Sequence, residues 1–180
     1  MSASPDPNPE AAPNPPPQPR RWRRHVGSLV LFVVLVVGIS TVMGKLRAPR
    51  LPEVAPAFAL ANLDGETVRL EELRGQTVVL NFWATWCPPC RLEIPSFSKF
   101  ARKHGDVPVL GIAVDGSREQ LIQAKEDMGI DYPVLIADPE TLAAYGVRSL
   151  PTTVIVGADG KVRSAHAGIL TGPQLWWMTR

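Results

Sequence analysis

The pattern of apolar and polar residues divides this chain of 180 residues into one long apolar run and a region of short segments. Residues 26–43 contain no charged side chain. From residue 57 onward, short apolar runs alternate with amphipathic segments that are broken by Gly, Pro and Asn. This second pattern predicts strands and helices in alternation around a mixed sheet, which is an α/β domain.

The expected elements follow from that alternation. Residues 77–83 form a nearly continuous apolar run, which is typical of a central strand covered on both faces. Residues 58–60 and 68–70 are predicted to pair as an amino-terminal hairpin, and residues 73–75 to close a short helical turn. Further strands are expected at residues 107–114, 132–136, 152–156 and 162–167, and helices from Cys87 onward and at residues 118–128, 139–145 and 173–178. Pro95 lies inside the first of these helices and is expected to kink it.

The first 56 residues have a composition of their own. Residues 1–25 are rich in proline and end in a cluster of arginines, which predicts a disordered cytoplasmic tail. The uncharged run that follows would rise roughly 27 Å as a helix, close to the thickness of a bilayer core. We therefore interpret residues 26–44 as a transmembrane anchor, residues 45–56 as a linker and residues 57–180 as the folded domain.

The arginines before the apolar run predict the orientation of the anchor. Basic residues stay on the cytoplasmic side, so the domain is expected in the periplasm or outside the bacterial cytoplasmic membrane. Two alternatives remain for the same run. One is a cleaved signal peptide with a weak cleavage site at residues 42–44, and the other is a buried helix of a soluble protein. The anchor and the signal peptide both export the domain into an oxidising compartment.

Charge is distributed unevenly along the chain. Residues 1–50 carry seven Lys and Arg against two Asp and Glu, whereas residues 51–180 carry twelve against fifteen. The folded domain is therefore mildly acidic, and its basic residues form no cluster. Nucleic-acid binding, which needs a clustered basic face, is not expected.

Cys87 and Cys90 are the only cysteines in the chain. Two cysteines at this spacing, at the start of a helix, can form a disulfide that opens and passes electrons to another disulfide. The reaction needs an exposed thiolate of low pKa, which Cys87 can supply at the helix amino terminus, and a shielded thiol, Cys90, that resolves the mixed disulfide. A structural disulfide over so short a loop would stabilise little, and a zinc site lacks further clustered ligands. We expect neither a metal nor a cofactor.

The residues around the cysteines carry a family resemblance. Residues 81–91, Asn-Phe-Trp-Ala-Thr-Trp-Cys-Pro-Pro-Cys-Arg, resemble the active-site segment of TlpA/ResA-like, membrane-anchored thiol-disulfide oxidoreductases of the thioredoxin fold. Residues 93–95, 150–153 and the two segments at 56–60 and 73–75 are also similar to that family. The resemblance implies a thioredoxin fold in which a mixed central sheet is flanked by helices, with an amino-terminal β-hairpin extension and one transmembrane helix before it.

The resemblance also implies roles at the site. Cys87 attacks a substrate disulfide and Cys90 resolves the mixed species. Leu150-Pro151 is similar to the family's cis-proline loop, so Pro151 is expected to be cis and the backbone of Leu150 to hold an extended substrate segment. Trp86 stands beside the cysteines, where it packs around the site and contributes to substrate binding.

Glu93 is the candidate proton carrier. Thioredoxins usually have a buried aspartate at the strand position where this chain has Asn81, and Asn81 cannot titrate. ResA-like proteins have a glutamate three residues after the second cysteine, and Glu93 matches it. It would pass protons to and from Cys90. A solvated carboxylate on the helix surface is the alternative.

The implied function is reduction of disulfides in exported proteins, with apocytochrome c and copper-site proteins among the substrates. A membrane electron-donor carrier would recharge the protein. A second hypothesis is that the protein works as an oxidase or an isomerase. A thiol peroxidase of the redoxin type is a third, although such proteins usually have a lone cysteine in a Thr-x-x-Cys setting, and Thr85 is only two residues before Cys87. A copper-binding module without turnover is a fourth, although copper carriers of this fold space their cysteines by three and add a histidine; His166 is a lone candidate.

Overall fold

Two units make up the chain, residues 1–39 and residues 40–180. The computed structural model describes residues 20–47 and 51–180, so the expected disordered tail lies largely outside the described residues, as does part of the linker. Helix α1 (Arg20–Arg47) contains the run predicted as an anchor. Among the residues that the structure describes, no helix is long and apolar enough to cross a membrane.

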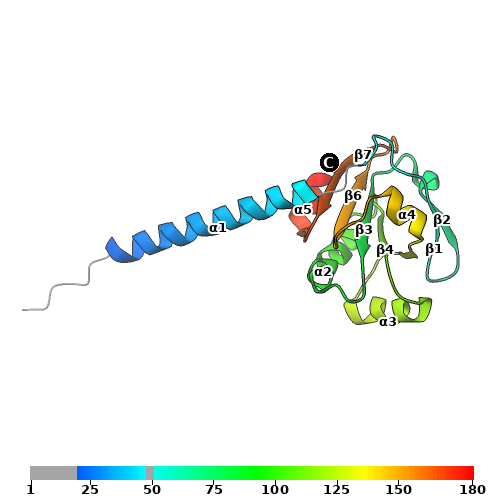
Figure 1. Cartoon of the computed structure of the whole chain (residues 1–180), viewed down its shortest axis with the longest axis horizontal. Helices are drawn as coiled ribbons and strands as arrows, with labels where there is room; N and C mark the ends of the chain where they lie inside the picture. The colour runs from blue at the N-terminus through cyan, green and yellow to red at the C-terminus, as the bar shows by residue number, and fades with distance from the viewer. Residues whose placement is uncertain (1–19, 48–50) are drawn as a thin grey trace, which may run out of the picture. The chain divides into compact units, whose positions relative to one another are not determined.

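The second unit is organised around a five-stranded mixed sheet (Figure 1). Its central strand β3 is buried along all six residues, as its apolar sequence predicts. It pairs in parallel with β4 and antiparallel with β6. The strand order is β5-β4-β3-β6-β7, and the bounds are β3 (Val78–Trp83), β4 (Val109–Ala113), β5 (Val134–Ile136), β6 (Thr152–Val156) and β7 (Val162–Ala167).

A separate two-stranded sheet forms the amino-terminal hairpin. Strands β1 (Ala59–Ala61) and β2 (Thr67–Arg69) pair antiparallel, and a short helical turn, η1 (Leu70–Leu73), follows. The side-chain oxygen of Asn62 accepts hydrogen bonds from the backbone N–H groups of Asp64 and Glu66, at 2.9 Å each. These bonds close the turn of the hairpin that the sequence predicts.

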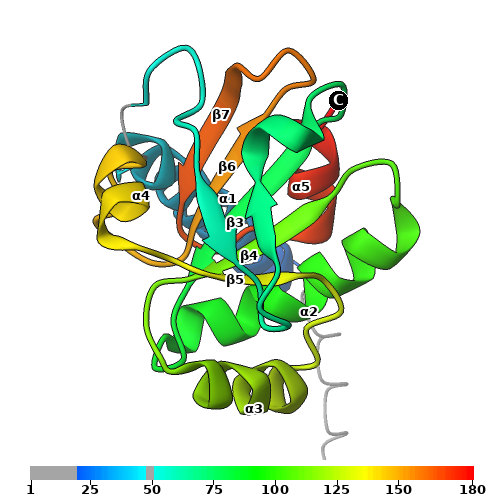
Figure 2. The same cartoon turned by 90° about the vertical axis from the view of Figure 1, so that its right-hand side faces the viewer.

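Helices cover both faces of the sheet. One face packs against α2 (Pro88–Lys103), α3 (Arg118–Met128) and α5 (Gly172–Met178), and the other against the hairpin and α4 (Pro139–Ala144). In Figure 2 the hairpin crosses in front of the sheet. Alternate residues of β3 point to opposite faces, so Val79 and Trp83 contact the first layer while Leu80 and Phe82 contact the second. The expected mixed sheet with flanking helices is confirmed.

The observed elements differ from the expected ones by a few residues at their ends. The strands predicted at residues 107–114 and 132–136 are shorter, because Pro108 and Pro133 have no N–H to donate to a neighbouring strand. Pro95 does lie inside α2, and the helix continues past it to Lys103.

Candidate active site

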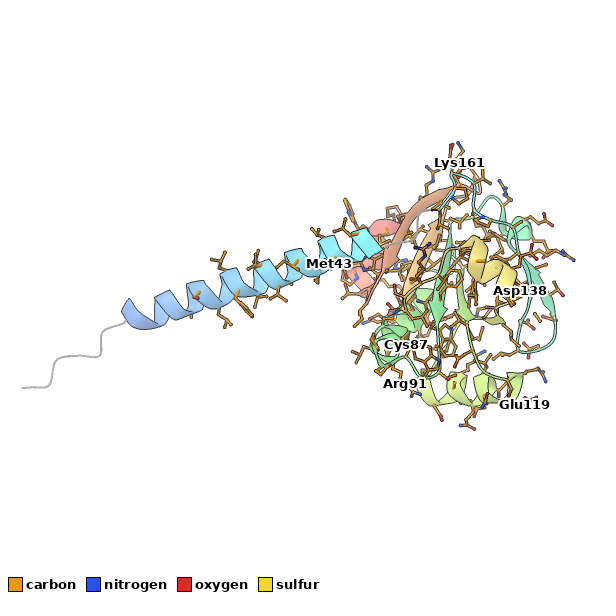
Figure 3. The ribbon with its side chains drawn as sticks, in the orientation of Figure 1. Met43, Cys87, Arg91, Glu119, Asp138 and Lys161 are labelled. Carbon is orange, nitrogen blue, oxygen red and sulfur yellow. A yellow bond between two sulfur atoms is a disulfide. The ribbon has the colours of Figure 1, made fainter. Side chains whose placement is uncertain are left out.

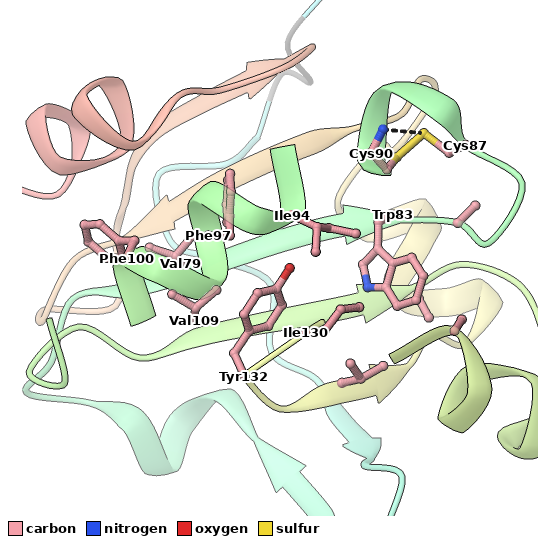
Figure 4. Packing of buried hydrophobic residues seen from close by; sticks show 14 of the residues in the cluster. Val79, Trp83, Cys87, Cys90, Ile94, Phe97, Phe100, Val109, Ile130 and Tyr132 are labelled. Carbon is pink, nitrogen blue, oxygen red and sulfur yellow. Dashed lines mark hydrogen bonds between the residues drawn. A yellow bond between two sulfur atoms is a disulfide. The ribbon is translucent and has the colours of Figure 1, made fainter. Parts of the chain in front are cut away.

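The two cysteines lie at the amino terminus of α2. Cys87 is the residue that caps the helix, with an extended backbone, and Pro88 and Pro89 fill the first turn, where a missing N–H costs nothing. Cys87 and Cys90 form a disulfide with their Cα atoms 5.3 Å apart. The backbone N–H of Cys90 donates a hydrogen bond of 3.2 Å to the sulfur of Cys87 (Figure 4). Once the disulfide opens, this donor and the helix dipole favour a thiolate at Cys87.

The disulfide is more deeply buried than the sequence suggested. Cys87 is 2 % exposed and Cys90 is fully buried. The expectation of an exposed Cys87 is therefore wrong for this oxidised state, because the sulfur of Cys87 turns inward to bond Cys90 within the core cluster. The neighbouring Pro88 and Pro89 are exposed, and Trp86 is 67 % exposed.

The loop between β3 and α2 is held from two sides. The N–H and hydroxyl of Thr85 donate to the two carboxylate oxygens of Asp115, at 3.0 and 2.9 Å. Arg91 donates to the carbonyl oxygen of Thr85 at 2.9 Å, and Figure 3 shows Arg91 next to Cys87. The hydroxyl of Thr85 is therefore committed to Asp115. This arrangement positions Trp86 and Cys87, which complete the loop.

Sequence reasoning missed Asp115 as part of the site, although a signal was present. Asp115 follows β4 almost directly, and β4 runs parallel to β3. Because the carboxyl ends of parallel strands meet at one edge of a sheet, an acid after β4 lies close to the loop that follows β3.

Glu93 lies one turn after Cys90 on α2 and is 1 % exposed. The side-chain amide of Asn81 donates to one carboxylate oxygen at 2.7 Å, and the backbone N–H of Leu170 donates to the other at 3.0 Å. Burial raises the pKa of Glu93 from its usual 4.5 to about 7, and the two hydrogen bonds from Leu170 and Asn81 oppose that rise. The structure therefore places Glu93 in the core, and the alternative of a solvated surface carboxylate is wrong.

The loop before β6 forms another part of the site. The Leu150–Pro151 peptide bond is cis, as expected. Pro151 is buried, Leu150 is half-buried, and the carbonyl oxygen of Pro151 accepts a hydrogen bond of 2.8 Å from the N–H of Gly168. Thr152 pairs with Phe82 across β6 and β3, so this loop lies at the end of β3 that leads into the disulfide.

The described residues offer no ready metal centre: no three His, Cys, Asp or Glu side chains among them lie together as a possible ligand set. The arrangement that is present consists of a redox-capable disulfide, a buried carboxyl of raised pKa behind it and an exposed tryptophan beside it. These groups can perform thiol-disulfide exchange with coupled proton transfer.

Known proteins share this sequence and fold. Residues 52–165 match the AhpC/TSA family. The chain is 36% identical over 125 residues to the thiol-disulfide oxidoreductase ResA of Halalkalibacterium halodurans, a match covering 68% of this chain and 71% of that protein. It is 37% identical over 161 residues to ResA of Geobacillus thermodenitrificans, covering 84% and 92%. A thiol:disulfide interchange protein of the thioredoxin family from Chlorobium tepidum has a similar structure, with a TM-score of 0.66, 29% identity and coverage of 72% and 95%.

The fold and the site together define a thiol-disulfide oxidoreductase of the thioredoxin fold. The chain belongs to the AhpC/TSA family, and its similarity to ResA confirms the ResA-like resemblance drawn from residues 81–91.

Proposed function

We propose that this protein is a membrane-anchored, extracytoplasmic reductant of disulfides in exported proteins. The observation that carries the proposal is the Cys87–Cys90 disulfide at the start of α2, with the buried carboxyl of Glu93 one turn behind it. The reducing direction rests on the resemblance to ResA-like proteins. In an oxidising compartment, a reductant also needs electrons from a donor, and we assign that task to a dithiol carrier in the membrane.

The first step of the proposed reaction forms a mixed disulfide. In the reduced protein, the thiolate of Cys87 attacks one sulfur of the substrate disulfide. A bond forms between Cys87 and that sulfur, the substrate's own S–S bond breaks, and the released substrate thiolate takes a proton from solvent. The N–H of Cys90, which points at the sulfur of Cys87, favours the attacking thiolate.

The second step releases the substrate. The thiol of Cys90 gives its proton to the ionised carboxylate of Glu93, and the sulfur of Cys90 then attacks Cys87. The Cys87–Cys90 disulfide forms again, the mixed disulfide breaks, and the second substrate thiolate leaves and is protonated. Two electrons have passed to the substrate. A pKa of about 7 suits Glu93 for this exchange, because the carboxyl can both accept and release a proton near neutral pH.

The substrate segment is expected to lie between Trp86 and the cis-proline loop. Trp86 offers a large exposed aromatic surface beside the disulfide. The backbone of Leu150, before the cis bond, would bind an extended segment of the substrate. We propose proteins with cysteine pairs at haem or copper sites, such as apocytochrome c, as substrates, because the ResA-like resemblance of residues 81–91 implies them.

The proposed location rests on the amino-terminal sequence. Arginines precede an uncharged run that begins at residue 26, which favours a span with its amino terminus in the cytoplasm. The match to Geobacillus ResA covers 84% of the chain, more than residues 51–180 alone can fill, so it extends into this segment. Proteolysis of intact cells and of opened cells, followed by detection of the domain in the membrane fraction, tests anchoring and orientation; recovery of a shortened soluble form would contradict the anchor.

Trapping tests the exchange reaction itself. A Cys90→Ser variant cannot resolve the mixed disulfide. When the full-length variant is expressed in the organism that the chain comes from, it should accumulate adducts that are linked through Cys87 and cleaved by a reductant. The matched Cys87→Ser variant should form far fewer adducts, because Cys90 is fully buried. Equal trapping by both variants, or none by either, would contradict the roles of Cys87 as the attacking cysteine and Cys90 as the resolving cysteine.

A further inference from the structure

Buried polar atoms without a protein partner gather around Glu93. In the described part of the chain, four buried side-chain atoms have no hydrogen-bond partner, and three of them belong to Asn81, Trp83 and Tyr132. Native proteins pair nearly all such atoms with protein groups or with bound water. Asn81 is also the residue that donates to Glu93 through the nitrogen of the same side-chain amide. Each of these three atoms therefore needs a partner that the protein itself does not supply.

Gly111 brings the side chains of these three residues into one part of the core. Gly111 pairs with Asn81 across β4 and β3. A Cβ atom at Gly111 would lie 2.8 Å from ring atom Cε2 of Tyr132 and 3.0 Å from the indole nitrogen of Trp83. The absence of a side chain at Gly111 thus admits the tyrosine ring and the indole N–H next to Asn81. Figure 4 shows the hydroxyl of Tyr132 pointing toward α2 and the indole nitrogen of Trp83 turned toward Tyr132.

The hydroxyl of Tyr132 also lies within electrostatic reach of Glu93. Burial raises the pKa of Tyr132, and the charge of Glu93 raises it further. Asp131, the neighbour of Tyr132 in the chain, is partly exposed and forms an ion pair with Arg102. Cys90, on the same helix as Glu93, titrates only after the disulfide opens, and His166 on β7 pairs in register with Thr153. Asn81 and the N–H of Leu170 donate to Glu93, Thr153 accepts from Asn81, and none of these three groups titrates.

We propose that Tyr132 is a positioning residue for Glu93: its hydroxyl and the indole N–H of Trp83 hold one buried water molecule that donates to Asn81 and to Glu93. The hydrogen bonds balance. The water accepts from the two donors, and it gives its own two hydrogens to the amide oxygen of Asn81 and to a free lone pair of the carboxylate. The inference rests on the proposed function, because it assigns Tyr132 to the proton step of Glu93.

The water acts on the ionised form of Glu93. A carboxylate in the core loses its hydration, and each donor that replaces that hydration stabilises the charge. Asn81 and Leu170 supply two donors, and the water held by Tyr132 supplies a third. Without it, the carboxyl of Glu93 keeps its proton to a higher pH, so a smaller fraction is ionised at neutral pH and able to accept the proton of Cys90.

The test is a Tyr132→Phe variant of the full chain in its oxidised form, in which the disulfide-bonded cysteines do not titrate. Infrared spectroscopy of the carboxyl band follows the ionisation of Glu93, with Glu93→Gln identifying its signal. We expect the pKa of Glu93 to rise by about half to one pH unit relative to the unsubstituted chain. The variant removes only an oxygen that has no protein partner, so the fold should persist, and an unfolding measurement checks this.

A matched control is available in Tyr145→Phe. Tyr145 is also fully buried, but it lies on the other face of the sheet, where its hydroxyl donates to the carbonyl oxygen of Pro56 at 2.7 Å. This variant should lose stability and leave the pKa of Glu93 unchanged. An unchanged pKa in Tyr132→Phe, or an equal rise in Tyr145→Phe, overturns the inference.

A second readout separates this inference from the proposed function. The pH profile for resolution of a mixed disulfide should move to higher pH in Tyr132→Phe, and the Tyr132→Phe change should have no such effect in a Glu93→Gln background. If Glu93→Gln alone leaves the profile unchanged, the proton-relay role of Glu93 fails while the pKa shift still stands. If Glu93→Gln alters the profile and Tyr132→Phe does not, only the role of Tyr132 fails.

Discussion

The side-chain amide of Asn81 donates a hydrogen bond of 2.7 Å to the carboxylate of Glu93, and both residues are buried in the domain core. The bond joins the central strand β3 to helix α2 just below the disulfide. Because Asn81 is neutral, it offers the carboxylate a donor but no charge. Burial therefore dominates, and the pKa of Glu93 rises to about 7.

The raised pKa predicts how stability depends on pH. The folded protein keeps the proton of Glu93 up to about pH 7, whereas the unfolded chain releases it near the usual 4.5, so the folded state binds more protons between these values. The contribution of Glu93 is fully present below 4.5 and is lost as pH rises, by about 3 kcal/mol in total. Denaturant unfolding of the unsubstituted chain and of Glu93→Gln, near pH 4.5 and near pH 7, measures this loss of stability. A difference between the two proteins that does not change with pH would contradict the burial of the carboxyl.

The kinetics of resolution should depend on the same group. Resolution needs Glu93 ionised, so its rate should rise with pH through an apparent value near 7. In Glu93→Gln we expect that rise to disappear and the rate at neutral pH to fall about 100-fold. Stopped-flow release of a thiol from a preformed mixed disulfide on Cys87 gives the profile.

The control for that experiment is Glu126→Gln, which removes an exposed glutamate from α3. It should leave both the rate and the profile unchanged. A profile of Glu93→Gln that overlays that of the unsubstituted chain would take the proton step away from Glu93.

Trp86 is predicted to bind substrate rather than stabilise the fold. Its side chain is 67 % exposed, so Trp86→Ala should change the unfolding free energy by less than about 0.5 kcal/mol. The KM for a protein disulfide should rise about tenfold, because exposed tryptophans at binding surfaces often carry much of the affinity. Trp177→Ala, on α5 and 75 % exposed, is the matched control and should leave KM unchanged. Equal effects of the two variants would count against a substrate surface at Trp86.

The two hydrogen bonds from Thr85 predict that Asp115 holds the loop between β3 and α2 in place. Asp115→Ala removes the acceptors of two hydrogen bonds from Thr85 and should destabilise the domain by about 1–3 kcal/mol. It should also slow exchange, because the loop that carries Trp86 and Cys87 is then less firmly held. Asp106→Ala, at an exposed position, should do neither. Denaturation and disulfide-exchange assays on both variants test the expected losses of stability and of exchange rate.

The sequence predicts the fold well because local signals agree with tertiary packing. The apolar run of β3 is a buried central strand, and Ser117 and Gly129 bound α3 as a helix cap and a left-handed stop. The cysteine spacing at the start of α2 likewise predicts the disulfide.

Contacts between distant segments could not be predicted in this way. Leu170 reaches Glu93 through a backbone N–H, which any residue other than proline possesses, so the sequence carries no sign of it. Tyr132 comes beside Trp83 only because Gly111 leaves space in β4, and that proximity depends on strand register. The burial of Cys87 depends on which way its sulfur turns, which spacing alone does not determine.

The reduction potential of the Cys87–Cys90 pair tests the central proposal most directly. The full chain is equilibrated in glutathione or dithiothreitol buffers of known potential, and the fraction of free thiols is measured at pH 7. A reductant of exported disulfides should have a potential at or below about −270 mV, near that of thioredoxin. A potential near −120 mV, that of the strong oxidant DsbA, would contradict the proposed direction.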